Sequence, residues 1–202
     1  MAMTSAAMEH TRSLNGGAWV EESALVIPVT LPKALDWIRS QFDPMAQVLP
    51  VHVSLLIPFA NRALDDTVDR QLKRLTQTFS PLVLEARGVG FFSGEELDTV
   101  YLAIADNVHF DGILSTVCAE FPQYPPYGGR HPDIIPHVTL ARVPSHEVQQ
   151  VHKMAQIALN GLGGTITMAA SALAWITRTS PMADPQNWLA NIYPLGSARD
   201  RR

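Results

Sequence analysis

The chain has 202 residues, 47% of them hydrophobic, and its 15 basic and 19 acidic residues give a formal net charge of −4. This length and apolar content are sufficient for a hydrophobic core, so we expect one folded body. The acidic balance excludes the broad cationic surface that holds long duplex nucleic acid, so a nucleic-acid substrate should be short or only a chain end.

The two ends of the sequence predict tails around a single domain. Residues 1–18 lack the basic start and apolar core of a signal peptide and predict a disordered segment. No apolar run approaches the roughly 20 residues of a membrane helix, so no membrane contact is expected. Cys118 is the only cysteine, which excludes an internal disulfide and favours a cytoplasmic protein. Residues 197–202 predict a charged tail, leaving 19–196 as one domain, expected to be monomeric.

The first half of the sequence predicts strand, helix, strand, helix and strand. Residues 23–30 are typical of a strand, and apolar side chains then recur at helical spacing over 31–42. The apolar run 51–59 predicts a second strand. A helical stripe follows over 64–79, and residues 82–92 alternate like a strand.

The second half predicts the same order again. Residues 99–105 predict a strand, 110–121 a helix, and 136–143 another apolar strand. A helix over 148–159 is followed by two predicted closing strands, at 165–177 and 188–193. Because the order occurs twice, we predict a bilobal body with a pseudo-two-fold repeat, whose lobes share strands.

A loop rich in proline and glycine precedes the second of these apolar strands. Residues 122–135 contain four prolines and two glycines. Such a loop is a candidate lip of a substrate site, and a plain surface crossover is the equally weighted alternative. Tyr127 could stack on a base and Arg130 could contact a phosphate, or the tyrosine simply packs within the loop while the arginine is solvated.

Each half carries one apolar strand with a histidine and a hydroxyl two residues apart. Side chains alternate in a strand, so His52 and Ser54 share one face, as do His137 and Thr139. If the halves are related by a two-fold axis, these faces converge. Two imidazoles and two hydroxyls suit a phosphate, and a neutral and a protonated histidine can act as base and acid on a phosphodiester.

The same alternation places Leu56 and Ala141 on the two histidine faces and Ile57 on the opposite, core face. A single histidine in an apolar strand is more often structural, and one short triplet occurs by chance. Two copies in corresponding strands favour a functional pair. A metal site fits poorly, because neither strand has a carboxylate or cysteine beside its histidine and only His131 could be recruited as a third ligand.

At these motifs the sequence resembles the 2H phosphoesterase superfamily, in particular its 2′-5′ RNA ligase or RNA 2′,3′-cyclic phosphodiesterase branch. HVSLLIPF in the first motif strand and FPQYPPYGGRHPDIIPHVTLARV at 121–143 are the parts most similar to bacterial members. The closing NWLANIYPLG is similar to their final strand, and the resemblance covers about residues 23 to 195.

The resemblance implies an α+β fold with two antiparallel sheets around a central groove and helices outside. It implies His52 and His137 as the catalytic pair and Ser54 and Thr139 as donors to phosphate oxygens, with no metal or other cofactor. The implied activity is phosphodiester hydrolysis at a 2′,3′-cyclic phosphate RNA end or in a small nucleotide, with reversible 2′-5′ ligation. The alternatives are a hydrolase of 2′-5′ oligonucleotide or cyclic dinucleotide messengers, and a non-catalytic phosphate-binding module.

Overall fold

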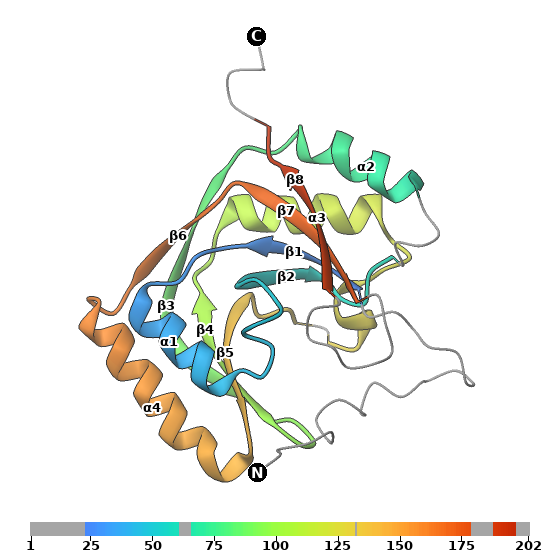
Figure 1. The fold of residues 1–202 in the computed structure, drawn as a ribbon. Helices are drawn as coiled ribbons and strands as arrows, with labels where there is room; N and C mark the ends of the chain where they lie inside the picture. Colours follow the sequence, from blue (N-terminus) through green and yellow to red (C-terminus); the bar gives the residue numbers. More distant parts are fainter. Residues whose placement is uncertain (1–22, 61–65, 132, 179–187, 197–202) are drawn as a thin grey trace.

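The structure, a computed structural model, describes residues 23–60, 66–131, 133–178 and 188–196 (Figure 1). The predicted tails and the first residues of the predicted domain lie outside these ranges. The described strands are β1 (Ser23–Pro28), β2 (His52–Leu56), β3 (Leu82–Phe92), β4 (Asp98–Ile104), β5 (His137–Val143), β6 (Ile166–Ala170), β7 (Ala172–Arg178) and β8 (Trp188–Pro194). The described helices are α1 (Lys33–Phe42), α2 (Asp66–Thr76), α3 (Val108–Glu120), α4 (Ser145–Gly161) and the short 3₁₀ helix η3 (Pro126–Gly129).

The strands form one antiparallel sheet in the order β6-β3-β4-β5-β2-β1-β7-β8. The predicted α+β class with antiparallel strands is confirmed. The two expected sheets are instead halves of one sheet, because the two histidine strands pair directly, with Val53 opposite Val138. This pairing satisfies backbone groups that two separate sheets would leave at their edges.

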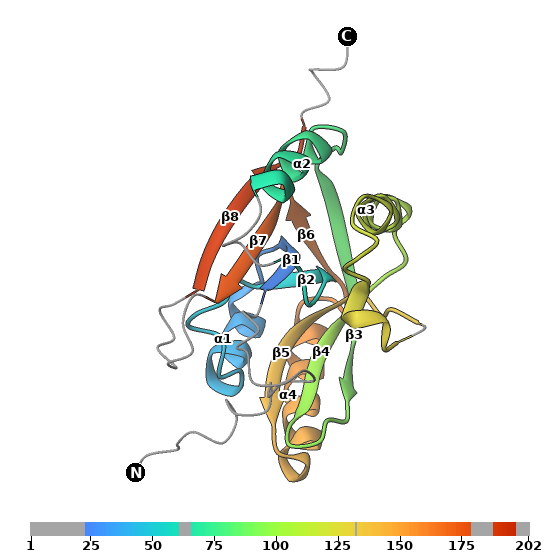
Figure 2. The same cartoon turned by 90° about the vertical axis from the view of Figure 1, so that its right-hand side faces the viewer.

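The strand order is symmetric about the β2–β5 pair. Outward from β2 the strands are β1, β7 and β8, and outward from β5 they are β4, β3 and β6. Strand β3 ends the first half of the sequence but pairs with β4 and β6 of the second half (Figures 1 and 2). The predicted repeat of element order is therefore present, and each half of the sheet contains strands from both halves of the sequence.

Residues 165–177 contain two strands, so the prediction of a single strand over this range was wrong. Strand β6 pairs with β3 at one end of the sheet, whereas β7 pairs with β1 in the other half. The two are separated only by Ser171. Apolar residues continue on both sides of this residue, so the hydrophobic pattern shows no interruption.

The hydrophobic core lies between the helices and one face of the sheet. Helices α1 and α4 lie side by side next to β5, while α2 lies by β8 and α3 near β2 and β3 (Figures 1 and 2). In α4 the buried side chains are those of the predicted apolar face, Val148, Val151, Ala155 and Leu159. Burying a Val or Leu side chain contributes about 1.5–3 kcal/mol, so this face fixes the helix on the sheet. Among the described helices, none combines the length and apolar character needed to cross a bilayer.

Candidate active site

The pairing of β2 with β5 brings the four motif residues to one place. With Val53 opposite Val138, the antiparallel register sets His52 across from Thr139 and Ser54 across from His137. Val53 and Val138 are buried in the core, whereas the four polar residues are half-buried and lie on the opposite face of the sheet. Side chains directly opposed in this way have Cβ atoms about 5 Å apart. We call this surface, with His52, Ser54, His137 and Thr139, the histidine face.

The two histidine rings are held by matching hydrogen bonds. His52 Nδ1 lies 2.7 Å from the carbonyl oxygen of Pro50, and His137 Nδ1 lies 2.7 Å from that of Ile135. A carbonyl only accepts, so Nδ1 carries the proton and donates it in both rings. The neutral rings then bear their lone pair on Nε2. Both histidines are therefore fixed in the tautomer that offers Nε2 as a base.

Both histidines favour the neutral form in the free protein. Burial lowers the pKa of His52 to about 4; the bond to Pro50 opposes this shift, and the positive charges of Arg142 and Arg39 add to it. Burial, with a smaller contribution from Arg142, also lowers the pKa of His137. At pH 7 the site therefore holds two neutral imidazoles beside a guanidinium, an arrangement that an anion would stabilise.

A β-bulge in β5 brings Arg142 onto the histidine face. Tyr101 of β4 is opposite Thr139, but its neighbour Val100 is opposite Ala141, so one extra residue is inserted in β5. Leu140 and Ala141 are consequently both buried, and Arg142 is half-buried. The prediction that Ala141 lies beside His137 was wrong, because a bulge reverses the alternation beyond it.

The first histidine strand has a bulge at the matching place. Leu25 of β1 is opposite Leu56 while Val26 is opposite Ser54. Leu55 and Leu56 are both buried, and Ile57 is exposed, the reverse of the assignment from simple alternation. Ile57 thus occupies the position that corresponds to Arg142. Within the described part of the chain, the histidine face carries a cation at its Arg142 end only.

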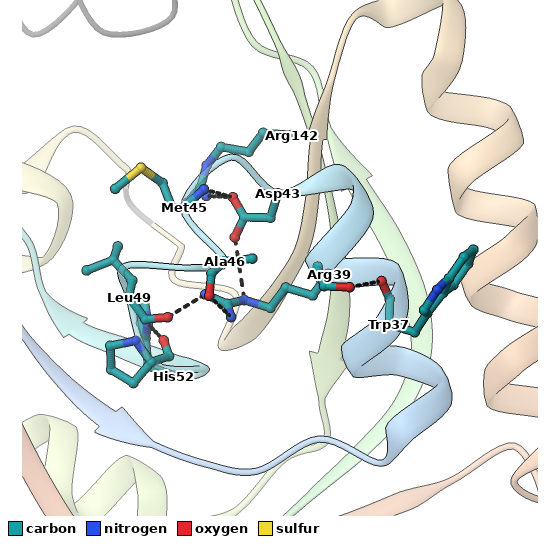
Figure 3. A network of polar contacts seen from close by, with 10 residues as sticks. Trp37, Arg39, Asp43, Met45, Ala46, Leu49, His52 and Arg142 are labelled. Atoms are coloured by element: carbon teal, nitrogen blue, oxygen red, sulfur yellow. Dashed lines mark hydrogen bonds and ion pairs between the residues drawn. The ribbon is translucent and has the colours of Figure 1, made fainter. Parts of the chain in front are cut away.

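Arg142 is held by a buried carboxylate that sequence reasoning did not identify. Its Nη1 lies 2.6 Å from Oδ1 of Asp43, whose side chain is 2% exposed. Asp43 also pairs with Arg39 of α1, at 3.5 Å. Arg39 and Asp43 are four positions apart, whereas Arg142 is 99 positions from Asp43, and the three lie beside the loop that leads to His52 (Figure 3). A charged Asp next to a helix end is common on protein surfaces, so nothing in the sequence pattern marks these residues.

Aromatic rings surround His137. Its ring centroid lies 5.1 Å from that of Phe92 and 5.2 Å from that of Tyr101, and those two rings are stacked at 4.2 Å. A Cβ on Gly90 would lie 2.5 Å from the Tyr101 ring. Gly90 therefore leaves the space for Tyr101, which in turn limits the solvent around His137 and helps to lower its pKa.

The loop rich in proline and glycine reaches the histidine face through Tyr127. Burial raises the pKa of Tyr127, and a hydrogen bond with the Ser54 side chain opposes that shift. Tyr127 has φ 51°, an unusual backbone conformation for a residue other than glycine. Arg130 is exposed, and its Nε donates to the Tyr127 carbonyl oxygen at 3.4 Å. Of the two weaker candidates, the structure places Tyr127 at the site, and it gives Arg130 no contact with the four motif residues.

Among the described residues, no three His, Cys, Asp or Glu side chains are grouped so that they could hold a metal ion. His131, the possible third ligand considered from the sequence, has its ring 5.8 Å from that of Tyr127. The acceptors and donors on the histidine face are imidazoles, hydroxyls and a guanidinium. This set matches an anion better than a cation.

Comparison with known proteins gives one family and a group of solved structures. A model of the 2′-5′ RNA ligase superfamily matches residues 27–179, a range that contains both histidine motifs. TT0787 of Thermus thermophilus has a TM-score of 0.54 at 15% identity, with 88% of this chain and 99% of that chain covered. Escherichia coli LigT has a TM-score of 0.51 at 13% identity, with 88% and 98% covered.

A second structure of Escherichia coli LigT, complexed with 3′-AMP, has a TM-score of 0.50 at 11% identity, with 88% of this chain and 99% of that chain covered. At these identities the similarity shows a shared fold. No curated protein sequence matches the chain.

Proposed function

The chain belongs to the 2′-5′ RNA ligase superfamily, and on that premise we propose that it is a metal-independent phosphodiesterase that uses His52 and His137 on a ribose phosphodiester. The substrate is a short RNA end with a 2′,3′-cyclic phosphate or a small nucleotide, and a 5′-hydroxyl in place of water as the nucleophile would give a reversible 2′-5′ ligation at the same site. Ser54, Thr139 and Arg142 hold the phosphate oxygens. Membership in this superfamily supports an enzymatic role.

The observation that supports this proposal best is that the two histidines have matching surroundings. Each is two residues before a hydroxyl, each donates Nδ1–H to the carbonyl two residues earlier, and the two strands pair with each other. A histidine kept only for packing needs no partner with the same hydrogen bond across the strand pair. A phosphodiester needs two such groups, because one oxygen loses a proton while another gains one.

In the proposed reaction, Nε2 of one neutral histidine removes the proton from the attacking water. The water oxygen forms a bond to phosphorus as the bond to a ribose oxygen breaks. The second histidine, protonated when the anionic substrate binds, gives its Nε2 proton to that leaving oxygen. In ligation a 5′-hydroxyl takes the place of the water, and in the reverse of that ligation the two histidines exchange these roles.

Arg142 explains how the site recognises a phosphate while its histidines remain neutral in the free protein. Its positive charge contributes to the lowered pKa of both rings. A bound phosphate offsets that charge and raises the pKa of the nearer imidazole, so protonation is coupled to substrate binding. The net charge of −4 supports a small substrate, and the LigT complex with 3′-AMP supports a nucleotide.

The test of the proposed function is a turnover screen of the purified protein. The panel contains 2′,3′-cyclic mononucleotides, 2′-5′ dinucleotides, cyclic dinucleotides and RNAs with cyclic phosphate ends. We expect hydrolysis of the 2′,3′-cyclic phosphates to give one monophosphate isomer. Binding of these compounds without turnover would identify a phosphate-binding module instead, and cleavage of only the messengers would change the substrate class.

Removal of metal ions should leave the activity unchanged, because imidazole, hydroxyl and guanidinium groups carry the proposed chemistry. We expect the same kcat/KM before and after dialysis against EDTA, measured on the best substrate of the panel. Activity that disappears on dialysis and returns only with added zinc or manganese contradicts the proposed site.

Loss of either hydroxyl should reduce turnover. Ser54→Ala and Thr139→Ala are each expected to lower kcat/KM by about 10²-fold to 10³-fold, the scale for one transition-state donor. The matched controls are Ser54→Thr and Thr139→Ser, which keep the hydroxyl and should stay within about tenfold of the wild type. Equal losses in the alanine and hydroxyl-retaining variants would show that shape, not hydrogen bonding, matters at these positions.

The Tyr127 hydroxyl should have a smaller effect, because it acts on the phosphate through Ser54. We expect Tyr127→Phe to lower kcat/KM by about threefold to tenfold, since one neutral hydrogen bond has a net value of about 0.5–1.5 kcal/mol. The measurement is repeated in the Ser54→Ala protein, where Tyr127→Phe should have little further effect. An undiminished effect there would assign the hydroxyl a separate role.

A further inference from the structure

The loop before His52 is fixed by Arg39, a residue of α1. Arg39 lies in the last turn of the helix and is buried. Its guanidinium donates from Nη2 to the Leu49 carbonyl oxygen at 2.7 Å and from Nη1 to that of Ala46 at 3.3 Å. The next carbonyl along the chain, that of Pro50, accepts the Nδ1–H of His52. Arg39 therefore fixes the backbone directly beside the group that sets the tautomer of His52.

Asp43 connects this loop to Arg142. Its Oδ2 pairs with Nε of Arg39, and its Oδ1 accepts from Arg142 and from the Met45 N–H, the latter at 3.1 Å. Figure 3 shows the carboxylate between the two guanidinium groups. One carboxylate thus holds the cation of the histidine face and the residue that fixes the His52 loop.

The charges of this group are unequal. Two guanidinium groups contact one carboxylate, with the charge of Asp36 also acting more weakly on Arg39, and the side chains of Arg39 and Asp43 are 6% and 2% exposed. Poorly hydrated positive charge without a full counter-charge is unfavourable, and an anion that reaches Arg142 relieves it. The group is therefore suited to an anionic ligand on the histidine face.

Among the residues that the structure describes, no basic side chain supports the second histidine as Arg39 supports the first. Helix α3, which corresponds to α1 in the repeat, has no basic residue in its last turn. His137 is instead flanked by the rings of Phe92 and Tyr101. The two histidines share the same hydrogen-bond geometry but are positioned by different means, so the effect of Arg39 can be tested on one with the other as a control.

We infer that Arg39 and Asp43 are positioning residues for the reaction: Arg39 orders the loop whose Pro50 carbonyl fixes His52, and Asp43 joins that loop to Arg142. Neither residue touches the substrate. That these residues serve catalysis rests on the proposed function, whereas their effect on His52 and on phosphate affinity is measured without turnover.

The first test measures the histidine tautomers by NMR of protein with ¹⁵N-labelled imidazoles. In the wild type we expect both His52 and His137 as the Nδ1–H tautomer. In Arg39→Met we expect His52 to shift toward the Nε2–H tautomer while His137 is unchanged. If that variant does not fold, Arg39→Lys serves, because it keeps the charge without the planar fork that reaches two carbonyls. An unchanged His52, or equal changes in both rings, overturns the role of Arg39.

The second test is a double-mutant cycle with Asp43→Asn and Arg142→Met. We expect Asp43→Asn alone to lower kcat/KM by about tenfold to 10²-fold, the cost of a small misplacement. In the Arg142→Met protein the same change should cost less than about threefold, because coupled residues are not additive. The control is Glu85→Gln, which breaks an exposed ion pair with Arg87 and should have no effect. Equal losses in both backgrounds reduce Asp43 to a structural role.

The same cycle is measured with inorganic phosphate as the ligand, by titration calorimetry. Asp43→Asn removes a negative charge, which by itself favours an anion, but it also frees Arg142 from its position. We expect the loss of position to dominate, so phosphate binding should weaken in the wild-type background and should not weaken in the Arg142→Met protein, where only the charge effect remains. If no substrate of the panel is turned over, the proposed function fails, but the tautomers and the phosphate affinities still decide the positioning. A loss of phosphate affinity that is independent of Arg142 contradicts the role of Asp43.

Discussion

Replacement of either histidine by alanine should lower kcat/KM on the best substrate by about 10²-fold to 10⁴-fold, the contribution of one general acid or base. In the proposed mechanism His52 and His137 share a single proton exchange on one phosphate, so the double variant should be little worse than either single variant. The matched control is His109→Ala, which removes an exposed histidine of α3. Each variant is compared with the wild type by circular dichroism and thermal unfolding.

The pH dependence should accompany these losses. In the free protein the pKa of His52 is lowered to about 4 and the pKa of His137 is also lowered. One ring must begin neutral and the other protonated, so kcat/KM should be bell-shaped with its maximum on the acid side of the ordinary histidine pKa of about 6.5. A folded His52→Ala or His137→Ala protein with near wild-type turnover would falsify the paired mechanism.

Loss of the Arg142 charge should have the second-largest effect. We expect Arg142→Met to lower kcat/KM by about 10²-fold or more, because it removes the only cation found on the described histidine face, where the proposed reaction develops charge on the phosphate. Arg142→Lys should recover part of this loss, since an ammonium keeps the charge but lacks the fork that binds two phosphate oxygens.

The same variant should move the pH profile. The Arg142 charge opposes protonation of both rings, and its removal raises the pKa of His52 and of His137. The maximum of kcat/KM in Arg142→Met should therefore lie at higher pH than in the wild type. Arg87→Met, which removes an exposed arginine of β3, is the control and should leave the profile unchanged. A shift to lower pH, or none, contradicts the assigned position of Arg142.

The parts of the fold that sequence periodicity predicted are those in which the pattern is uninterrupted. Strand β3 has the bounds expected from its alternation, and α4 buries the side chains of its predicted stripe. The place of the four motif residues on one sheet face also followed from alternation, because they precede both bulges. The direct pairing of β2 with β5 did not follow, since register between distant strands is set by the whole sheet.

Two of the residues that sequence reasoning missed, Arg142 and Asp43, depend on such long-range features. Arg142 reaches the histidine face because a bulge inserts one residue, and an extra residue in a strand leaves no mark on an apolar sequence. Asp43 and Arg142 are 99 positions apart and meet only because α1 lies next to β5. The contact of Tyr127 with Ser54 depends on the path of a loop, which hydrophobic patterns do not describe.

The central claim is that His52 and His137 bind one phosphate group together. It is tested most directly by NMR titration of the imidazole-labelled protein with a nucleoside 3′-monophosphate. We predict that both rings shift with a single dissociation constant and that the pKa of at least one rises on binding, with the effect abolished in Arg142→Met. Shifts confined to one histidine, two different dissociation constants, or no response of either ring would contradict a shared phosphate site.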